Sequence, residues 1–172
     1  MVSIRAATAE DAQAIARVHV ESWRTTYAGI VPDAYLAGLD EILRVKLWQE
    51  WLGGDTVILV AERKGEVVGF AHAGKVREAI EGADAELYSL YLVKEAQGRG
   101  IGRELLRVLA AVLMEQGFKS LALWVLERNR ARAFYEQCGG RIAVSRVIEI
   151  GGARLMEVSY WWPELSVLTE LD

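Results

Sequence analysis

The stretch that decides the fold runs Glu86-Leu-Tyr-Ser-Leu-Tyr-Leu-Val-Lys-Glu-Ala-Gln-Gly-Arg-Gly-Ile-Gly102. Its first half is almost continuously apolar or aromatic, which favours a central strand buried on both faces. Three glycines then fall within six residues, at Gly98, Gly100 and Gly102. After them, apolar residues recur at helical spacing, so the stretch predicts a strand, a glycine turn and an amphipathic helix in that order.

The glycine turn has the chemistry of a phosphate-binding site. The first amides of a helix lack intrahelical partners and lie at the positive end of the helix dipole. Glycines allow the backbone to approach an anion closely and to adopt positive φ. Two familiar nucleotide motifs do not fit. The order Gly98-Arg-Gly-Ile-Gly102 departs from the dinucleotide fingerprint, and Arg103-Glu104 follow where a Walker A loop has Lys and Ser or Thr.

A different pattern does fit, namely Gln/Arg-x-x-Gly-x-Gly/Ala after a buried strand. Gln97-x-x-Gly100-x-Gly102 matches it, and Asn129-Arg-Ala-Arg-Ala-Phe-Tyr-Glu136 follows downstream. With these two motifs the sequence resembles the GNAT superfamily of acetyl-CoA-dependent N-acetyltransferases. The resemblance implies that the glycine loop and helix start hold the pyrophosphate of coenzyme A. One departure is Lys94-Glu-Ala96, where the family usually has a proline and an aromatic residue.

Length and composition indicate one globular domain. The chain has 172 residues, of which 52% are hydrophobic and 26% charged. The net charge of −4 argues against nucleic-acid binding driven by charge. A single cysteine, Cys138, excludes an internal disulfide. Because no apolar leader and no run of about 18 apolar residues occurs, we expect a cytoplasmic protein without a membrane or nucleic-acid partner.

The order of expected elements is β-α-α-β-β-β-α-β-α-β-β, the layout that the resemblance implies. We therefore expect an α/β (α+β) fold of the GNAT acyl-CoA N-acyltransferase type, with a mixed central sheet of about seven strands flanked by about four helices. The domain is expected over residues 1–162, followed by an acidic C-terminal tail at 163–172. The other expected segments are strands at 4–7, 56–62, 67–73, 120–126, 142–150 and 154–161, helices from residue 12, at 41–52 and at 130–137, and a loop at 75–84.

Acetyl transfer to an amine requires a held cofactor, a polarised carbonyl, a deprotonated ammonium and a protonated thiolate. For polarisation, the resemblance implies the strand backbone near Leu90, Tyr91 and Leu92. The glycine turn at residues 97–102 is the candidate for holding the cofactor. The alternative is that this turn is only structural and that the basic residues around it are solvated. The candidates for holding are Gln97, Gly98, Arg99, Gly100, Ile101, Gly102, Arg103 and Arg130, with Lys94 as a further cation.

Glu86 is the candidate base. It lies four residues before Leu90, the spacing of the catalytic glutamate in histone-acetylating members of the superfamily. A carboxylate on a mostly buried strand is costly unless it is used or paired. The alternatives are a glutamate that faces solvent beside Asp84, or one that only binds the amine while water carries the proton.

Tyr135 is the candidate acid, because it occupies the position of the family's thiolate-protonating tyrosine. A phenol can hydrogen-bond the sulfur and stays protonated at neutral pH. The alternative is a core aromatic residue, which is the interpretation we give to Phe134. Asn129 is expected to cap a helix, to contact the cofactor, or to do both.

For the acceptor, the resemblance implies a cleft near the first two helices and the last hairpin. Trp23, Tyr27 and Tyr88 are candidates for its wall, although the aromatic residues of the first helices would serve equally as core or as a dimer contact. The predicted function is direct transfer of acetyl from acetyl-CoA to a primary amine of a small molecule or of a protein N-terminus or lysine. The alternative is a non-catalytic acyl-CoA sensor or interaction module.

No metal site is expected, because His19 and His72 lack metal-ligand spacing and are interpreted as structural. Cys138 has no recognisable base beside it, so we expect no acyl-enzyme. Six tryptophans and an apolar last hairpin in a small domain predict a homodimer.

Overall fold

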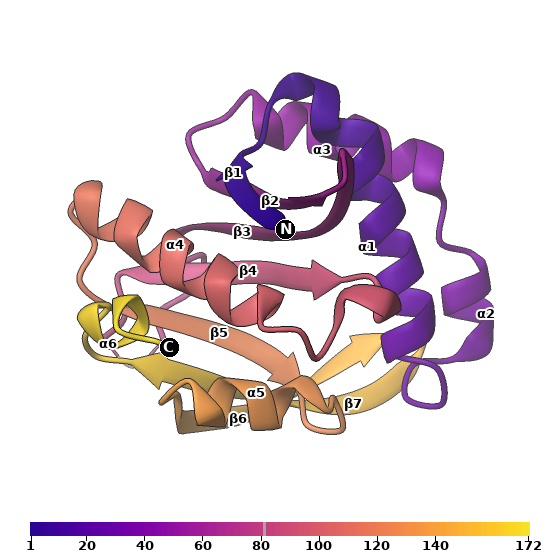
Figure 1. Ribbon diagram of the computed structural model, residues 1–172. Helices are drawn as coiled ribbons and strands as arrows, with labels where there is room; N and C mark the ends of the chain where they lie inside the picture. The colour runs from indigo at the N-terminus through magenta and orange to yellow at the C-terminus, as the bar shows by residue number, and fades with distance from the viewer. Residues whose placement is uncertain (81) are drawn as a thin grey trace.

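The computed structural model describes residues 1–80 and 82–172, so Glu81 of the predicted loop lies outside the described residues. Within the described residues, seven strands form one sheet in the order β1-β2-β3-β4-β5-β7-β6 (Figure 1). Neighbouring strands are antiparallel except β4 and β5, which are parallel. The predicted mixed sheet of about seven strands is therefore confirmed.

The elements follow the predicted order along the chain. The strands are β1 (Val2–Ala6), β2 (Val57–Arg63), β3 (Glu66–Lys75), β4 (Ala85–Leu92), β5 (Leu121–Leu126), β6 (Arg141–Ile150) and β7 (Ala153–Trp162). The helices are α1 (Ala12–Thr26), α2 (Asp33–Ala37), α3 (Glu41–Leu52), α4 (Ile101–Glu115), α5 (Ala131–Gln137) and α6 (Ser166–Thr169), with 3-10 turns η1 (Ala9–Asp11) and η2 (Lys94–Ala96). Two helices were not expected, α2 and α6. They have only five and four residues, too few to show a helical period in the sequence.

Helices cover both faces of the sheet. Figure 1 shows α4 and α5 in front of it, and α4 packs against β1 to β4. On the other face, α1 packs against β3 and β4 with α3 stacked on α1. Phe70 and Tyr91, opposite each other in β3 and β4, both contact His19 of α1. The predicted amphipathic helix α4 turns Leu105, Leu106, Leu109 and Leu113 into the main core, where all are fully buried. None of the described helices is both long and apolar enough to span a bilayer.

The segment at 163–172 packs against the rest of the domain. Its helix α6 lies against α4, and both Leu165 and Leu168 are buried in the main core. The backbone N–H of Leu165 donates to the carbonyl of Lys119 at 2.8 Å. The buried side chains of Leu165 and Leu168 therefore anchor this segment to the domain.

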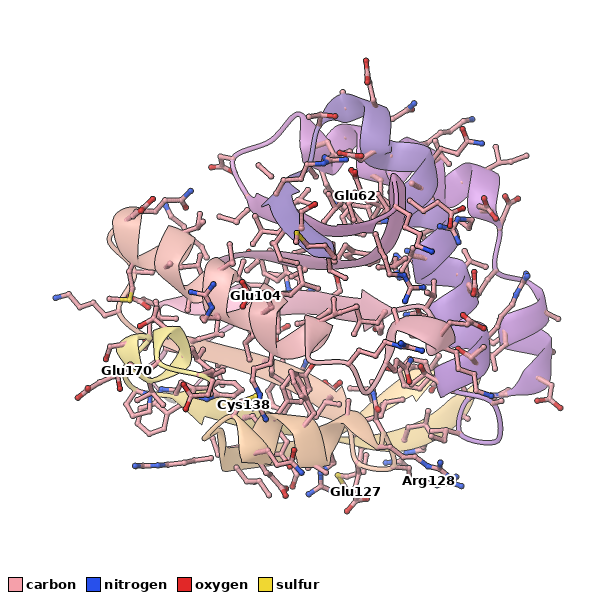
Figure 2. All side chains as sticks on the ribbon, in the orientation of Figure 1. Glu62, Glu104, Glu127, Arg128, Cys138 and Glu170 are labelled. Atoms are coloured by element: carbon pink, nitrogen blue, oxygen red, sulfur yellow. The ribbon has the colours of Figure 1, made fainter. Side chains whose placement is uncertain are left out.

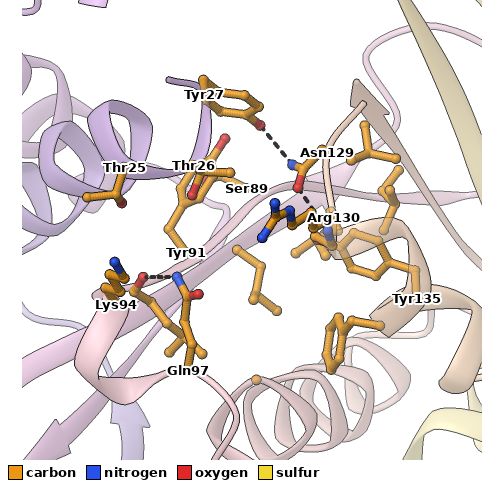
Figure 3. Close-up of a pocket in the computed structure, with 18 of the residues that line it drawn as sticks. Thr25, Thr26, Tyr27, Ser89, Tyr91, Lys94, Gln97, Asn129, Arg130 and Tyr135 are labelled. Carbon is orange, nitrogen blue, oxygen red and sulfur yellow. Dashed lines mark hydrogen bonds between the residues drawn. The ribbon is translucent and has the colours of Figure 1, made fainter. Parts of the chain in front are cut away.

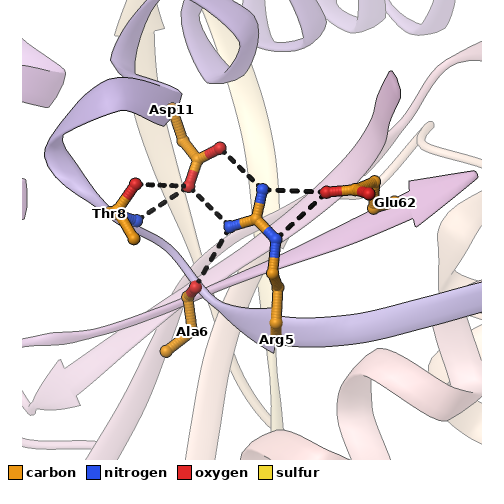
Figure 4. A network of polar contacts seen from close by, with 5 residues as sticks. All are labelled: Arg5, Ala6, Thr8, Asp11 and Glu62. Atoms are coloured by element: carbon orange, nitrogen blue, oxygen red, sulfur yellow. Dashed lines mark hydrogen bonds and ion pairs between the residues drawn. The ribbon is translucent and has the colours of Figure 1, made fainter. Parts of the chain in front are cut away.

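A polar network joins the start of α1 to the edge of the sheet (Figure 4). The Arg5 guanidinium donates to both oxygens of Asp11, at 2.8 and 2.9 Å, and to Glu62 on β2 at 2.9 and 3.1 Å. The backbone N–H of Thr8 also donates to Asp11, at 2.7 Å, as in a capping box. Hydrogen bonds from Arg5 hold the pKa of Asp11 below its ordinary value.

Both histidines have structural partners. His19 accepts a hydrogen bond from the Trp48 indole at 3.2 Å, and His72 bonds the Thr56 hydroxyl at 2.9 Å. Burial, the largest effect, lowers the pKa of His19 to about 3 and that of His72 to about 4. Both imidazoles are therefore neutral in the folded protein at neutral pH.

We expect these histidines to make the fold sensitive to acid. Because both pKa values are lowered from 6.5 by folding, the unfolded chain binds more protons below pH 6.5. The stabilisation is complete above that pH and falls, by up to about 1.4 kcal/mol per pH unit for each histidine, down to about pH 4. Urea denaturation between pH 4 and 7.5 measures the slope. His19→Phe should reduce it, and an unchanged slope in this variant would contradict the assignment.

Candidate active site

The two parallel strands at the centre of the sheet diverge. β4 pairs with β5 at only two positions, Ala85 with Leu121 and Glu86 with Ala122. Beyond them β4 continues to Leu92 beside β3, and β5 continues beside β7. The expectation that β4 is buried along its whole length is therefore wrong for its second half, which is only half-buried from Tyr88 onward because β5 has moved away. The edge of β4 that faces β5 keeps backbone groups without a strand partner there.

A β-bulge marks the start of the divergence. His72 pairs with Ser89 and Ala73 with Leu87, so Tyr88 is the extra residue on β4. The Tyr88 hydroxyl donates to the carbonyl of Lys75, which holds the bulged residue against β3. Bulges bend a strand and change the direction of its side chains, and they are frequent beside active sites.

A cavity of about 1090 Å³ fills the space between the diverging strands (Figure 3). It is bounded by the end of α1, the second half of β4, the glycine turn, β5 and the first turns of α5. The wall comprises residues 25–30, 87–92, 123–125 and 128–131, with Lys94, Gln97, Gly98, Gly100, Gly102, Arg103, Phe134, Tyr135 and Gln137. Most of the residues proposed from the sequence are thus brought together in one wall.

The glycine turn faces this cavity with bare backbone. Gly98 and Gly100 have φ of 69° and 78°, the left-handed region that favours glycine. A Cβ at either position would meet no atom within 4 Å, because each points into open space. Gly100 is the N-cap of α4, so the first amides of that helix are directed at the same space.

The charges in the wall are all positive. Lys94, Arg103, Arg128 and Arg130 line the cavity, and no carboxylate does so among the residues that the structure describes. Arg103 donates to the backbone carbonyl of Asp172 at 2.6 Å, which holds it beside α6. Four cations and a helix N-terminus suit a ligand that carries several phosphate charges.

Three of the proposed cofactor and acceptor residues lie outside the wall. Arg99 donates to the carbonyl of Glu95 at 3.0 Å. Ile101 is buried in the core behind the glycine turn. Trp23 packs its ring on Tyr27, with centroids 4.6 Å apart, and on Tyr35. Trp23 therefore supports the wall residue Tyr27 without reaching the cavity itself.

Asn129 connects α5 to α1 across the cavity. Its side-chain oxygen accepts at 2.9 Å from the backbone N–H of Ala131, the first residue of α5, so Asn129 satisfies an amide at the start of this helix although the N-cap position itself is Arg130. Its side-chain nitrogen donates to the Tyr27 hydroxyl at 3.2 Å (Figure 3). Both Asn129 and Tyr27 are buried. On the opposite side of the cavity, Gln97 donates to the carbonyl of Leu92 at 3.1 Å and fastens the glycine turn to β4.

Tyr135 is a wall residue on α5 (Figure 3). The rings of Phe134, Tyr160 and Trp162 surround it, and only 6% of the residue is exposed. Among the described residues, the Tyr135 hydroxyl makes no hydrogen bond to a side chain or a backbone group. Burial raises the pKa of Tyr135 well above its ordinary value, so the phenol is protonated at neutral pH.

Glu86 lies at the point where the strands begin to diverge, but it does not line the cavity. Its carboxylate is buried, with 2% of the side chain exposed, and is paired with Arg77 at 2.5 Å. Arg77 stacks over the Tyr88 ring, 4.8 Å from the centroid, and Tyr88 does line the cavity. The Glu86–Arg77 ion pair is therefore separated from the cavity by the side chain of Tyr88.

The wall residues that sequence reasoning missed include Trp124, Arg128 and Phe134. Phe134 was interpreted as core, yet it borders the cavity beside Gly102, where a Cβ would lie 3.4 Å from its ring. Trp124 could have been found from strand alternation, because Leu123 and Val125 on either side of it are buried in the core. Arg128 carries no such signal.

Cys138 is buried at the end of α5 (Figure 2). Burial raises the pKa of its thiol, so the thiolate is disfavoured. Among the described residues, no group of three or more His, Cys, Asp or Glu side chains is arranged to hold a metal ion.

Comparison with known proteins identifies the family. The model of the acetyltransferase (GNAT) family matches residues 17–140. The chain belongs to the GNAT family. It is 42% identical over 172 residues to the uncharacterized N-acetyltransferase YuaI of Bacillus subtilis, an alignment that covers 99% of this chain and 98% of YuaI. The resemblance seen in the sequence is therefore confirmed.

Two solved GNAT structures have a similar fold. The ribosomal-protein-alanine N-acetyltransferase of Brucella melitensis is 26% identical with a TM-score of 0.74, over 94% of this chain and 99% of that one. PaiA N-acetyltransferase of Thermoplasma acidophilum, in complex with coenzyme A, is 25% identical with a TM-score of 0.63, over 92% and 98%. The present chain is a GNAT N-acetyltransferase that uses acetyl-CoA.

We expect the two hydrogen bonds of Asn129 to be separable by substitution. Asn129→Ala removes the cap and the Tyr27 partner, and should lower the free energy of unfolding by about 1–2 kcal/mol. Asn129→Asp keeps an oxygen for the Ala131 N–H and should cost less. Urea denaturation at pH 7.5 measures both. Equal losses in the two variants would show that the cap contributes nothing to this GNAT fold.

Proposed function

We propose that this enzyme transfers the acetyl group of acetyl-CoA directly to a primary amine, carried by a small molecule or by a protein N-terminus or lysine. One observation carries the proposal: the divergence of β4 from β5 opens a cavity whose wall holds an unpaired strand edge, a bare glycine turn and Tyr135. The strand edge can form hydrogen bonds with the amide groups of pantetheine, the glycine turn can bind an anion, and Tyr135 can donate a proton. Acyl transfer from a thioester of coenzyme A requires all three.

The phosphate end of acetyl-CoA is proposed to lie on the glycine turn. Gly98, Gly100 and Gly102 offer backbone without side chains, and the N-terminus of α4 offers unpaired amides. Arg103 and Arg130 supply positive charge on either side of the same space. The pantetheine then extends along the free edge of β4, whose amide groups would pair with it as a neighbouring strand would.

The reacting end is proposed to lie near Leu90, Tyr91 and Leu92, where an amide of β4 polarises the thioester carbonyl. The amine nitrogen attacks the carbonyl carbon, and the carbon–oxygen π electrons move to the oxygen. When they return, the carbon–sulfur bond breaks and the thiolate leaves. Tyr135 gives its proton to the sulfur, for which its protonated, unpaired hydroxyl in the wall is suited. The nitrogen still carries two protons after the attack, and it returns one of them through water to the Tyr135 phenolate, so that the amide and the tyrosine both end neutral.

The proton of the acceptor ammonium is proposed to reach Glu86 through water. Glu86 lies at the apex of the diverging strands but outside the wall, so an intervening water is needed to span the gap. Its ion pair with Arg77 uses only one carboxylate oxygen. The second oxygen remains for a water or for an acceptor amine.

The acceptor is proposed to enter between Tyr27, Tyr88 and Trp124, the aromatic part of the wall. The similarity to a ribosomal-protein-alanine N-acetyltransferase supports keeping a protein N-terminus among the acceptors, beside small amines. The homodimer stays a prediction. A dimer interface on the edge strand β6 would cover its exposed aliphatic side chains, Ile142, Val144 and Val147.

We expect acetyl-CoA binding to depend on the bare backbone of Gly100. Gly100→Asp places a carboxylate and a Cβ where a phosphate would approach, and should weaken binding at least about tenfold, or about 1.4 kcal/mol. Isothermal titration calorimetry with acetyl-CoA measures the change.

Gly117→Asp is the matched control for this test. Gly117 also has positive φ, 92°, and a Cβ there would meet no atom within 4 Å, but this glycine does not line the cavity. Both variants should lose about 1 kcal/mol of stability from backbone strain. Equal weakening of acetyl-CoA binding by the two would contradict the phosphate assignment, and no binding by the natural chain would contradict the proposed function.

We expect Tyr135→Phe to lower kcat about 10²-fold, because the leaving thiolate loses its proton donor while the ring still fills its place. Glu86→Gln should lower kcat in the same assay, thiol release from acetyl-CoA with a panel of primary amines. The raised pKa of Tyr135 predicts no loss of activity from its ionisation up to about pH 10. If turnover in both variants matches that of the natural chain, the acid–base assignment is wrong.

A further inference from the structure

A second phenol faces the reacting end of the cavity. Tyr27, at the end of α1, lines the cavity together with Tyr135, although the two residues come from opposite sides of it (Figure 3). Only 5% of Tyr27 is exposed. A buried hydroxyl needs one hydrogen-bond partner for its oxygen and another for its hydrogen, because leaving either hydrogen bond unformed costs free energy.

The partner of the Tyr27 oxygen is Asn129, whose orientation is fixed by its hydrogen bond at the start of α5. The side-chain oxygen of Asn129 is occupied by the Ala131 N–H, so the other end of this amide, which faces Tyr27, is its NH2 group. An NH2 group only donates. The Tyr27 oxygen therefore accepts from Asn129 at 3.2 Å, and its hydrogen must be directed elsewhere.

Among the described residues, the Tyr27 hydroxyl makes no hydrogen bond other than the one from Asn129, and the residue lines the cavity, so the cavity is the direction open to its hydrogen. Burial, the largest effect, raises the pKa of Tyr27. The net direction is upward, so the phenol keeps its proton at neutral pH. Tyr27 thus presents a hydrogen-bond donor, held in place by Asn129, beside the free edge of β4.

We infer that Tyr27 is a further catalytic residue, whose hydroxyl donates a hydrogen bond to the thioester carbonyl oxygen of bound acetyl-CoA. The inference rests on the proposed function, which places that carbonyl near Tyr91. When the amine attacks, the carbonyl oxygen becomes negatively charged, and a fixed donor stabilises it more than it stabilises the neutral carbonyl. Asn129 is the positioning residue that fixes the direction of this donor.

The two phenols then have different tasks. Tyr27 keeps its proton throughout: it donates a hydrogen bond to the oxygen as the nitrogen–carbon bond forms and the oxyanion develops. Tyr135 loses its proton to the sulfur as the carbon–sulfur bond breaks. Because the tasks concern different atoms of the thioester, the two tyrosines are distinguishable by a probe of the carbonyl alone.

Infrared difference spectroscopy of acetyl-CoA labelled with carbon-13 at the carbonyl tests the inference. A hydrogen bond to the carbonyl lowers its stretching frequency relative to free acetyl-CoA. We expect the lowered frequency with the natural chain, and a shift back toward the free value in Tyr27→Phe, which lacks only the hydroxyl. Tyr135→Phe should leave the carbonyl frequency unchanged, because Tyr135 faces the sulfur.

Asn129→Asp gives a second, independent variant. A carboxylate at this position still accepts from the Ala131 N–H, but it now accepts from Tyr27 as well, so the Tyr27 hydrogen turns away from the cavity. The carbonyl frequency should shift as in Tyr27→Phe while the tyrosine is intact. Acetyl-CoA binding is checked by calorimetry in each variant, since the frequency is compared only for bound acetyl-CoA.

Three outcomes would overturn the inference. They are an unchanged carbonyl frequency in Tyr27→Phe, the same shift in Tyr135→Phe as in Tyr27→Phe, and loss of acetyl-CoA binding in both Tyr27→Phe and Asn129→Asp, which would assign Tyr27 to holding the substrate. Failure of the natural chain to bind acetyl-CoA is a different result, because it would contradict the proposed function itself.

Discussion

The rest of the site depends on the early end of pairing between β4 and β5. After Glu86 and Ala122 the two strands no longer bond each other, although each remains bonded to its outer neighbour. A backbone edge without a partner is costly when buried, so a fold keeps one only where water or a ligand satisfies it. The cavity supplies that space. The bulge at Tyr88 bends β4 at the same point, and the glycine turn and α5 begin at the open ends of the diverging strands.

Much of the fold could be predicted because its signals are local. The apolar run before the glycines, the helical period after them and the Gly151-Gly152 turn of the last hairpin each lie within a few neighbouring residues. The two short helices lack such signals. The last segment, residues 163–172, is too short to show a helical period, although it contains Leu165, Val167, Leu168 and Leu171, and only the burial of Leu165 and Leu168 shows that it belongs to the core.

Several residues that line the cavity could be predicted from their type. Glycine suits a turn in which φ is positive, and a tyrosine can supply a protonated hydroxyl, so Gly98, Gly100 and Tyr135 stood out in the sequence. Contacts made by distant residues were not predictable. The bond between Tyr27 and Asn129 joins positions 102 residues apart, and the pair of Glu86 with Arg77 depends on how the β3–β4 loop returns to the sheet. Both contacts depend on the tertiary arrangement of segments outside the strands, which no local pattern encodes.

The cavity wall carries positive charge in one part and neutral polar groups in another, which suits phosphate binding and acyl transfer respectively. The chain has a net charge of −4, yet the charged residues of the wall are the cations Lys94, Arg103, Arg128 and Arg130. In the proposed function these cations attract the phosphates of acetyl-CoA against the overall charge of the molecule. Near the free edge of β4 the polar groups are neutral phenols, and the carboxylate of Glu86 is paired outside the wall. A developing oxyanion there meets donors and no negative charge, whereas an acceptor must shed its own positive charge before it can react.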